Sequence, residues 1–200
     1  MSEIRAFIAV DLSAQILERI AQVSARLQEQ GKNLPVRWVP TDNIHFTLKF
    51  LGNVSLANLY VLKNSLIKLA ERFQPCEIGV GGIGAFPKLQ RPRVIWIGLE
   101  VSPELIALQR GIDLETVRLG YQREDRRYSP HLTIGRVKHN ASAQEIRLLM
   151  TLIEGTKVGL LGTLRIEDVH LYRSELKPGG AVYTRIFTAP LHREPVEPHG

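Results

Sequence analysis

Two short segments of the chain carry the same four-residue pattern. "HFTL" begins at His45 and "HLTI" begins at His131, so His-x-Thr followed by an apolar residue occurs once in each half of the 200-residue chain. Both segments have the composition of a β-strand, in which alternate side chains share a face. His45 and Thr47 are therefore expected to point together, as are His131 and Thr133. Each segment predicts an imidazole and a hydroxyl on one face of a strand.

Paired histidines suit acid–base chemistry on a phosphodiester. One neutral imidazole can take a proton from water while a second, protonated one gives a proton to the leaving oxygen, and both forms exist near neutral pH. Threonine hydroxyls can donate hydrogen bonds to phosphate oxygens. Either segment alone is most simply interpreted as half-buried strand residues, and it is the repetition that favours a site. Zinc is the weaker alternative, because neither segment has a carboxylate or thiol at ligand spacing.

The elements around these segments alternate between strands and helices. Helices are expected after Ser13, Ser55, Pro103 and Ser142, and further strands at 5–12, 36–39, 93–100, 163–173 and 182–191. The two histidines lie 86 residues apart (45 to 131), which is too far for a common solenoid repeat. The order of elements predicts an α+β protein of one domain, 1–200, with two related lobes of mainly antiparallel strands, each contributing one motif strand.

Two further expectations concern the packing of the strands. Strict alternation places Ile44, Phe46, Leu48 and Phe50 on an apolar face that should be core. The glycine-rich segment 79–84, "GVGGIG", lacks both the Gly-Lys-Ser/Thr of a phosphate-binding loop and the full dinucleotide spacing, so we expect a flexible connector between the lobes.

Composition excludes several classes of protein. The hydrophobic share of 44% is that of a globular chain, and no window approaches the ~18 apolar residues of a membrane span. The N-terminus lacks the order of a signal peptide, and a single cysteine, Cys76, excludes an internal disulfide. We expect a cytoplasmic protein with a frayed tail from about residue 192. The net charge of +6 is compatible with a polyanionic partner.

Several longer stretches resemble one family. They are "RAFIAVDL", "WVPTDNIHFTLKFLG", "GIGAFPKLQRPRVIWIGL", "YSPHLTIGRVK" and "LYRSELKPGGAVYT". The chain resembles the RNA 2′,3′-cyclic phosphodiesterases, also called 2′-5′ RNA ligase-like proteins, of the two-histidine phosphoesterase superfamily. The resemblance implies a bilobal fold with helices packed outside, whose two motif strands lie side by side in a central cleft. It implies no metal and no nucleotide cofactor.

The resemblance also implies roles for individual residues. His45 is the implied proton donor, His131 the proton acceptor, and Thr47 and Thr133 hold phosphate oxygens. Arg136 matches a family arginine that would neutralise charge in the transition state. Strict alternation places Arg136 on the face opposite His131, unless the strand ends there or Gly135 hosts a β-bulge.

Two aromatic residues are weighed beside these. Tyr128 is a candidate for stacking on a base, with a core or rim role about equally supported. Phe7, in the first strand, is expected to belong to the core.

The implied substrate is RNA with a terminal 2′,3′-cyclic phosphate, tRNA fragments included, which hydrolysis opens to a 2′-phosphate. Joining of RNA ends through a 2′-5′ bond would be a minor reverse activity. The implied protein is a monomer with no membrane or obligate protein partner. Two alternatives stay open, an RNA-end binder without catalysis and a phosphoesterase for another small cyclic phosphate.

Overall fold

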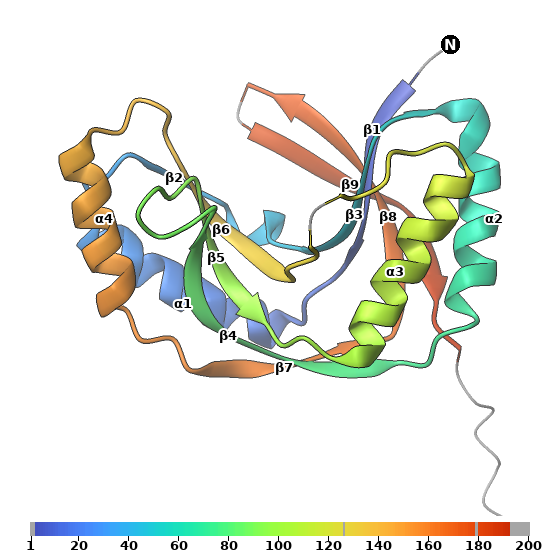
Figure 1. Cartoon of the computed structure of the whole chain (residues 1–200), viewed down its shortest axis with the longest axis horizontal. Helices are drawn as coiled ribbons and strands as arrows, with labels where there is room; N and C mark the ends of the chain where they lie inside the picture. Colours follow the sequence, from blue (N-terminus) through green and yellow to red (C-terminus); the bar gives the residue numbers. More distant parts are fainter. Residues whose placement is uncertain (1–2, 126, 179, 193–200) are drawn as a thin grey trace, which may run out of the picture.

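The computed structural model describes residues 3–125, 127–178 and 180–192. The tail that we expected to be frayed begins near the end of these ranges, and residues 193–200 lie outside them. The described chain forms two antiparallel sheets with helices on their outer sides (Figure 1). This confirms the predicted α+β class with two lobes.

Each sheet draws its strands from distant parts of the sequence. The four-stranded sheet has the order β3-β1-β8-β9, formed by Phe46–Ser55, Glu3–Val10, Asp168–Lys177 and Gly180–Pro190. The five-stranded sheet has the order β2-β6-β5-β4-β7, formed by Val36–Trp38, His131–Val137, Val94–Leu99, Cys76–Phe86 and Leu160–Ile166. The first motif therefore belongs to one sheet and the second motif to the other.

Four α-helices in the described residues cover the sheets. They are α1 Ala14–Gln30, α2 Leu59–Ala70, α3 Pro103–Arg118 and α4 Ala143–Gly155. Serine side chains cap three of them, and Ser142 forms a full capping box with Glu145 at the start of α4. Helices α2 and α3 flank the four-stranded sheet, whereas α1 and α4 flank the five-stranded sheet (Figure 1).

The two halves of the chain are interleaved in space. Strand β1 lies in the four-stranded sheet, α1 lies beside the other sheet, β3 returns to the first, and β4 joins the second. The second half mirrors this path, because β5 and β6 lie in the five-stranded sheet, α3 lies beside the four-stranded one, and β8 joins it. The order β3-β1-β8 thus corresponds to β6-β5-β4, and one continuous cluster of buried apolar side chains joins both lobes.

Two predictions about the strands were wrong. The expected strand 163–173 is two strands, because β7 pairs with β4 and β8 pairs with β1, with Glu167 between them. The glycine-rich segment is no flexible connector, since it lies within β4, which pairs with β5 and β7. Glycine is required there by close packing: a Cβ on Gly84 would lie 2.3 Å from the ring of Trp96.

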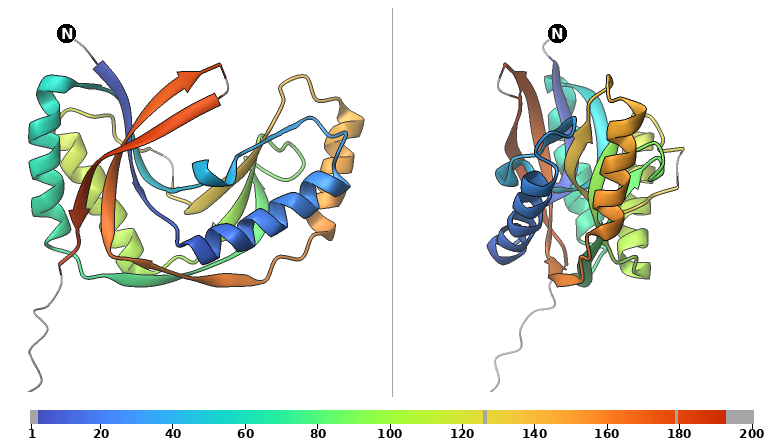
Figure 2. Two further views of the ribbon diagram at one scale, coloured as in Figure 1. Left: turned by 180° about the vertical axis from the view of Figure 1, so that it is seen from behind. Right: turned by 90° about the vertical axis from the view of Figure 1, so that its left-hand side faces the viewer.

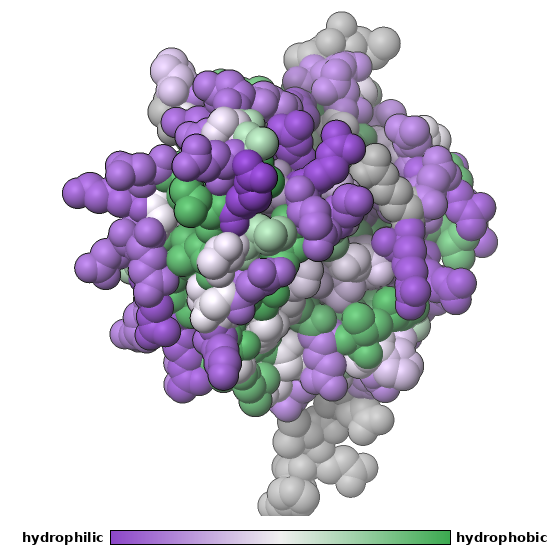
Figure 3. Space-filling view, turned by 60° about the vertical axis from the view of Figure 1, so that its left-hand side comes forward, coloured by the Kyte–Doolittle hydropathy of each residue, from purple (hydrophilic) through white to green (hydrophobic). Residues whose placement is uncertain are grey.

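The β8–β9 hairpin extends beyond β1, the neighbour of β8, over the space between the lobes (Figures 1 and 2). Hydrophilic side chains cover most of the face drawn in Figure 3, with smaller hydrophobic patches between them. In the described residues, no helix is both long enough and apolar enough to cross a membrane.

Candidate active site

The two motif histidines lie where the sheets meet. His45 immediately precedes β3, and His131 is the first residue of β6. Cα atoms of β3 and β6 approach within 8 Å of one another, although the strands belong to different sheets. The two motif strands are therefore side by side.

Both imidazoles are held by the same local contact. The Nδ1 atom of His45 lies 2.9 Å from the backbone oxygen of Asn43, and that of His131 lies 2.8 Å from the backbone oxygen of Ser129. Because a carbonyl oxygen only accepts, Nδ1 is the donor in each ring. The Nε2 atom of each histidine is therefore the one that can accept or release a proton.

Aromatic rings pack against both histidines. The centroid of the His45 ring is 4.6 Å from that of Phe7 and 4.9 Å from that of Tyr183. The ring of His131 meets that of Phe86 edge-on at 4.8 Å. Phe7 is 2% exposed, as expected of a core residue, yet it lies directly under the candidate proton donor. These rings fix the orientation of the imidazoles and exclude water from one side of each.

Burial and the charge of Arg136 lower the pKa of both imidazoles. Burial lowers the pKa of His45, and the positive charge of Arg136 lowers it further, against the hydrogen bond to Asn43 and the charge of Asp11, which raise it. Burial also lowers the pKa of His131, with Arg136 acting in the same direction and the hydrogen bond to Ser129 opposing them. Arg136 therefore acts on both histidines at once.

A β-bulge in β6 explains how Arg136 reaches the site. In β6, Thr133 pairs with Trp96 and Gly135 pairs with Ile95, so Ile134 is an extra residue. Ile134 and Gly135 are both buried, whereas Arg136 is exposed, like a residue of the His131 face. Strict alternation is thus broken, and the bulge that we considered at Gly135 is present one residue earlier.

The first motif strand has the matching bulge. Thr47 pairs with Ala9 and Lys49 pairs with Ile8, so Leu48 is the extra residue. The expectation that Phe50 belongs to the core was therefore wrong: its side chain is 65% exposed, while Lys49 is 4% exposed. Phe50 occupies in the first motif the position that Arg136 occupies in the second.

A second arginine lies opposite Arg136 on the neighbouring strand. Arg37 on β2 pairs directly with Arg136, and both side chains are exposed. Like charges opposite one another in a sheet repel, and an anion beside them removes the repulsion. Gly135 permits this approach of the strands, since a Cβ there would lie 3.0 Å from Val36 and 3.1 Å from Trp38.

The remaining predicted residues take different positions. Thr47 and Thr133 are half-buried on the faces of their histidines. Tyr128 is also half-buried, its hydroxyl donates to the backbone oxygen of Thr47 at 3.2 Å, and its ring lies 6.5 Å from that of Phe46. Tyr128 thus links the segment before His131 to the first motif strand, and its stacking on a base stays a prediction.

A cavity of about 740 Å³ opens beside the motif residues. It is bordered by Thr47 and Phe50 of β3, His131 of β6, Phe86 of β4 and the side chain of Arg127. Its lining comes from both sheets, so it forms the cleft between the lobes.

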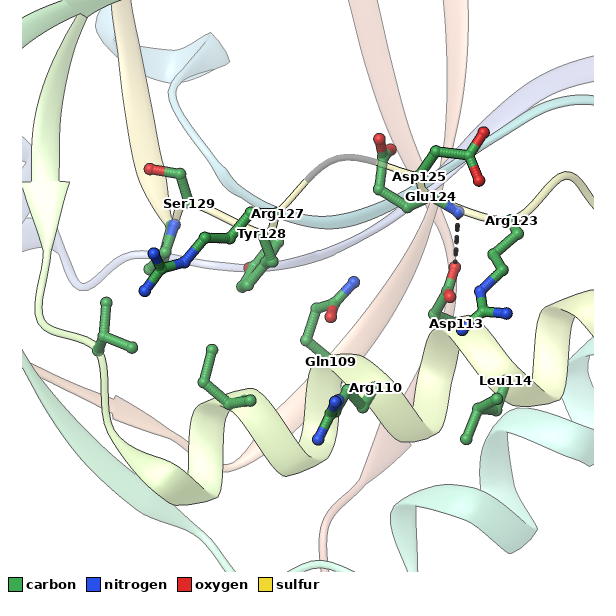
Figure 4. A pocket seen from close by; sticks show the side chains of 13 residues that line it. Gln109, Arg110, Asp113, Leu114, Arg123, Glu124, Asp125, Arg127, Tyr128 and Ser129 are labelled. Carbon is green, nitrogen blue, oxygen red and sulfur yellow. Dashed lines mark hydrogen bonds between the residues drawn. The ribbon is translucent and has the colours of Figure 1, made fainter.

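A second cavity, of about 1120 Å³, lies between α3 and residues 123–125 and 127–130 (Figure 4). Neither motif histidine lines it. The smaller cavity is lined by His131 and Thr47, although not by His45, and is therefore the one to which we assign the chemistry.

Sequence reasoning missed two charged residues near the site. Lys49 is buried and forms an ion pair with Asp113 of α3, and Asp11 stands close enough to His45 to raise its pKa. A lysine inside an apolar strand is the signal that could have revealed the first. In the described ranges, no three His, Cys, Asp or Glu side chains converge as they would around a metal ion, and independence from metal stays a prediction.

The protein thus has two interleaved lobes, each with a motif histidine at or just before the start of a strand. The family model for LigT-like phosphoesterases matches residues 10–96 and again 97–183. The chain belongs to this LigT-like phosphoesterase family.

Relatives and solved structures agree with this assignment. An RNA 2′,3′-cyclic phosphodiesterase of Methanothermobacter thermautotrophicus is 36% identical over 91% of this chain and 96% of its own. One of Methanocaldococcus jannaschii is 36% identical over 90% and 96%. Escherichia coli LigT complexed with 3′-AMP superimposes with a TM-score of 0.71 at 28% identity, covering 96% of this chain and all of that one.

Proposed function

We propose that this protein hydrolyses the terminal 2′,3′-cyclic phosphate of RNA to a 2′-phosphate without a metal ion. The observation that carries the proposal is the pair of histidines on adjacent strands, each with Nδ1 bound to a backbone oxygen and Nε2 left for proton transfer. Two such groups supply both proton transfers that the reaction needs.

The proposed reaction is a single displacement at phosphorus. Nε2 of neutral His131 accepts a proton from water as the water oxygen bonds to phosphorus. The bond from phosphorus to the 3′ oxygen breaks, and Nε2 of protonated His45 gives its proton to that oxygen. His131 ends protonated and His45 neutral, and exchange with solvent restores both. The choice of the 3′ oxygen as leaving group follows the family resemblance.

Three side chains would stabilise the charge that develops on phosphorus. Arg136 lies close enough to act on both imidazoles, and its repulsion with Arg37 falls when a phosphate binds. The hydroxyls of Thr47 and Thr133 can donate to the non-bridging oxygens.

RNA as the substrate is supported by the relatives and by the cleft. The relatives named above are RNA 2′,3′-cyclic phosphodiesterases, and E. coli LigT has been solved with 3′-AMP and with phosphate. The exposed ring of Phe50 offers a surface for a base, and the net charge of +6 favours a polyanion. A monomeric, cytoplasmic enzyme with minor 2′-5′ ligase activity completes the proposal.

A short RNA ending in a 2′,3′-cyclic phosphate, incubated with excess EDTA, tests the reaction. Mass analysis should show the gain of one water. Because the 2′- and 3′-phosphate products have the same mass, chromatography against a standard of each isomer should identify the 2′-phosphate. Binding without a mass change would favour the RNA-end binder. Hydrolysis of a nucleoside 2′,3′-cyclic phosphate but not of the RNA would favour the small-molecule alternative, and activity restored by zinc after EDTA would favour a metal site.

Substitution of each histidine tests the pair. His45→Ala and His131→Ala should each lower turnover by ~10²-fold or more, the usual effect of losing a general acid or base. His139→Ala is the matched control, since His139 is exposed and outside both motifs. Near-normal turnover from either folded motif variant would contradict the assignment.

A change of leaving group separates the two roles. An activated aryl phosphodiester needs little protonation of its leaving oxygen, so it should largely rescue loss of the proton donor and should not rescue loss of the acceptor. Recovery of His45→Ala but not of His131→Ala is expected. The reverse result would exchange the roles, and rescue of neither would mean that the histidines mainly bind phosphate.

A further inference from the structure

A cluster of charged and polar side chains surrounds Asp11, just after β1. The Asp11 carboxylate accepts a hydrogen bond from the hydroxyl of Tyr172, and a second from Nη1 of Arg185 at 2.8 Å. Nε2 of His170 lies 3.5 Å from the same carboxylate. These partners come from β8 and β9 and hold the carboxylate in one place beside the four-stranded sheet.

This cluster borders the candidate proton donor. The Tyr172 ring stacks on Phe7 with centroids 5.3 Å apart and planes 11° from parallel, and Phe7 in turn packs on His45. The centroids of Tyr172 and His45 are 6.4 Å apart. Asp11 is therefore linked to His45 through the rings of Tyr172 and Phe7, without forming a hydrogen bond to it.

Asp11 is an electrostatic difference between the two motif histidines, and it acts against burial, which is deeper at His45 than at His131. Both rings are partly buried, both bond through Nδ1 to the backbone oxygen two residues earlier, and both feel the charge of Arg136. The carboxylate of Asp11 raises the pKa of His45, whereas burial, the hydrogen bond to Ser129 and the charge of Arg136 shift the pKa of His131.

We infer that Asp11 is a positioning residue that directs the proton flow, because its fixed negative charge favours the protonated form of His45 and so makes this histidine the donor. The inference rests on the proposed function. Asp11 touches neither the substrate nor the reacting atoms. With Asp11 beside one ring only, two locally equivalent motifs acquire opposite roles.

Other charged and titratable groups also face His45, and they set the size of the effect. The charge of Arg136, on β6, acts on His45 in the direction opposite to that of Asp11. Arg185 and His170 offset part of the negative charge of Asp11. Tyr172 of β8 and Tyr183 of β9 are the titratable rings nearby. An unshielded opposite charge at ~4–6 Å shifts a pKa by about 1 to 3 units. Because Asp11 is itself paired, its expected effect is smaller than that of an unshielded charge.

Titration of the imidazole signals by NMR tests the inference without any substrate. Asp11→Asn keeps the shape and an acceptor oxygen but removes the charge. The pKa of His45 should fall measurably, and that of His131 should stay unchanged. Measurement of His45 in the His131→Ala background removes the coupling between the two sites.

Tyr172→Phe is the matched control. It removes the hydrogen bond to Asp11 but keeps both the carboxylate and the ring that stacks on Phe7. If the charge is responsible, this variant leaves the titration of His45 close to that of the wild type. An equal fall in Tyr172→Phe would show a structural effect and overturn the inference, as would an unchanged His45 in Asp11→Asn.

The rate profile then links the titration to catalysis. A donor must be protonated, so a lower pKa should move the alkaline limb of kcat/KM for the cyclic-phosphate RNA to lower pH in Asp11→Asn, by the same amount as the shift in the NMR titration. A shifted titration with an unmoved limb would overturn the role of Asp11 in catalysis. If the wild type hydrolyses no cyclic phosphate, the proposed function fails, while the titration still reports whether Asp11 acts on His45.

Discussion

The buried ion pair between Lys49 and Asp113 connects the first motif strand to the approach to the second. The side chains are 2% and 13% exposed. Lys49 also donates to the backbone oxygen of Gln122 at 2.6 Å, and the Asp113 carboxylate accepts from the backbone N–H of Glu124 at 3.2 Å (Figure 4). One buried pair therefore joins β3, α3 and the segment that leads to β6.

We predict that Lys49→Met lowers the free energy of unfolding by about 3 to 5 kcal/mol. Methionine nearly conserves the volume, but the substitution removes two charge-assisted hydrogen bonds, each worth about 1.5 to 3 kcal/mol. It also leaves the Asp113 carboxylate buried without its cation, and breaking a buried pair in this way destabilises by about 3 to 5 kcal/mol.

Urea unfolding followed by tryptophan fluorescence measures the effect. With a slope of about 2 to 3 kcal/mol per M, the midpoint of Lys49→Met should fall by about 1 to 2 M. Lys32→Met, at an exposed lysine, is the control and should change stability by no more than about 0.5 kcal/mol. The double variant Lys49→Met with Asp113→Leu should recover much of the loss, because no unpaired charge remains. A midpoint no lower than that of Lys32→Met, or a double variant whose loss equals the sum of the single losses, would refute the reasoning.

Three shorter predictions follow from the site. Arg136→Met should lower turnover of the cyclic-phosphate RNA by ~10²-fold or more without lowering the urea midpoint, because the repulsion with Arg37 disappears; a matching loss of stability would contradict this. Phe50→Ala should raise KM for the RNA, because the exposed ring would no longer stack on a base, an interaction worth about 1 to 3 kcal/mol. KM for a small aryl phosphodiester should stay unchanged, and equal changes for both substrates would exclude base stacking. Finally, burial lowers the pKa of His170, as it does for both motif histidines, so the unfolded chain binds protons that the folded chain does not. The free energy of unfolding should therefore fall as pH drops below ~6.5, by up to about 1.4 kcal/mol per pH unit for each histidine. Urea titrations at several pH values should show a smaller pH dependence for His170→Gln than for the wild type.

Much of the fold follows from local sequence signals. The serine caps and apolar spacing predict the helices, and the repeated His-x-Thr pattern predicts the paired strands. These features depend on neighbours within a few residues, which is why they can be seen in one sequence.

The errors arise where tertiary pairing overrides a local pattern. The bulges at Leu48 and Ile134 are set by the register with β1 and β5, so alternation alone placed Phe50 in the core and Arg136 on the wrong face. The passage from β7 to β8 has no breaker in the sequence, and only the choice of partner strands divides it at Glu167. The effect of Asp11 on His45 likewise depends on residues brought together by the sheet.

The interleaved path of the chain has a consequence for how such a molecule can arise. The repeats 10–96 and 97–183 each place strands in both sheets, so the boundary between repeats in sequence is not a boundary between lobes in space. In terms of symmetry, the molecule has the arrangement that a strand-exchanged dimer would have if its two subunits were joined in one chain. A single repeat expressed alone lacks partners for its strands, and a second copy supplies them. Such a dimer would have two identical motifs, and fusion is what allows one to carry Phe50 and the other Arg136.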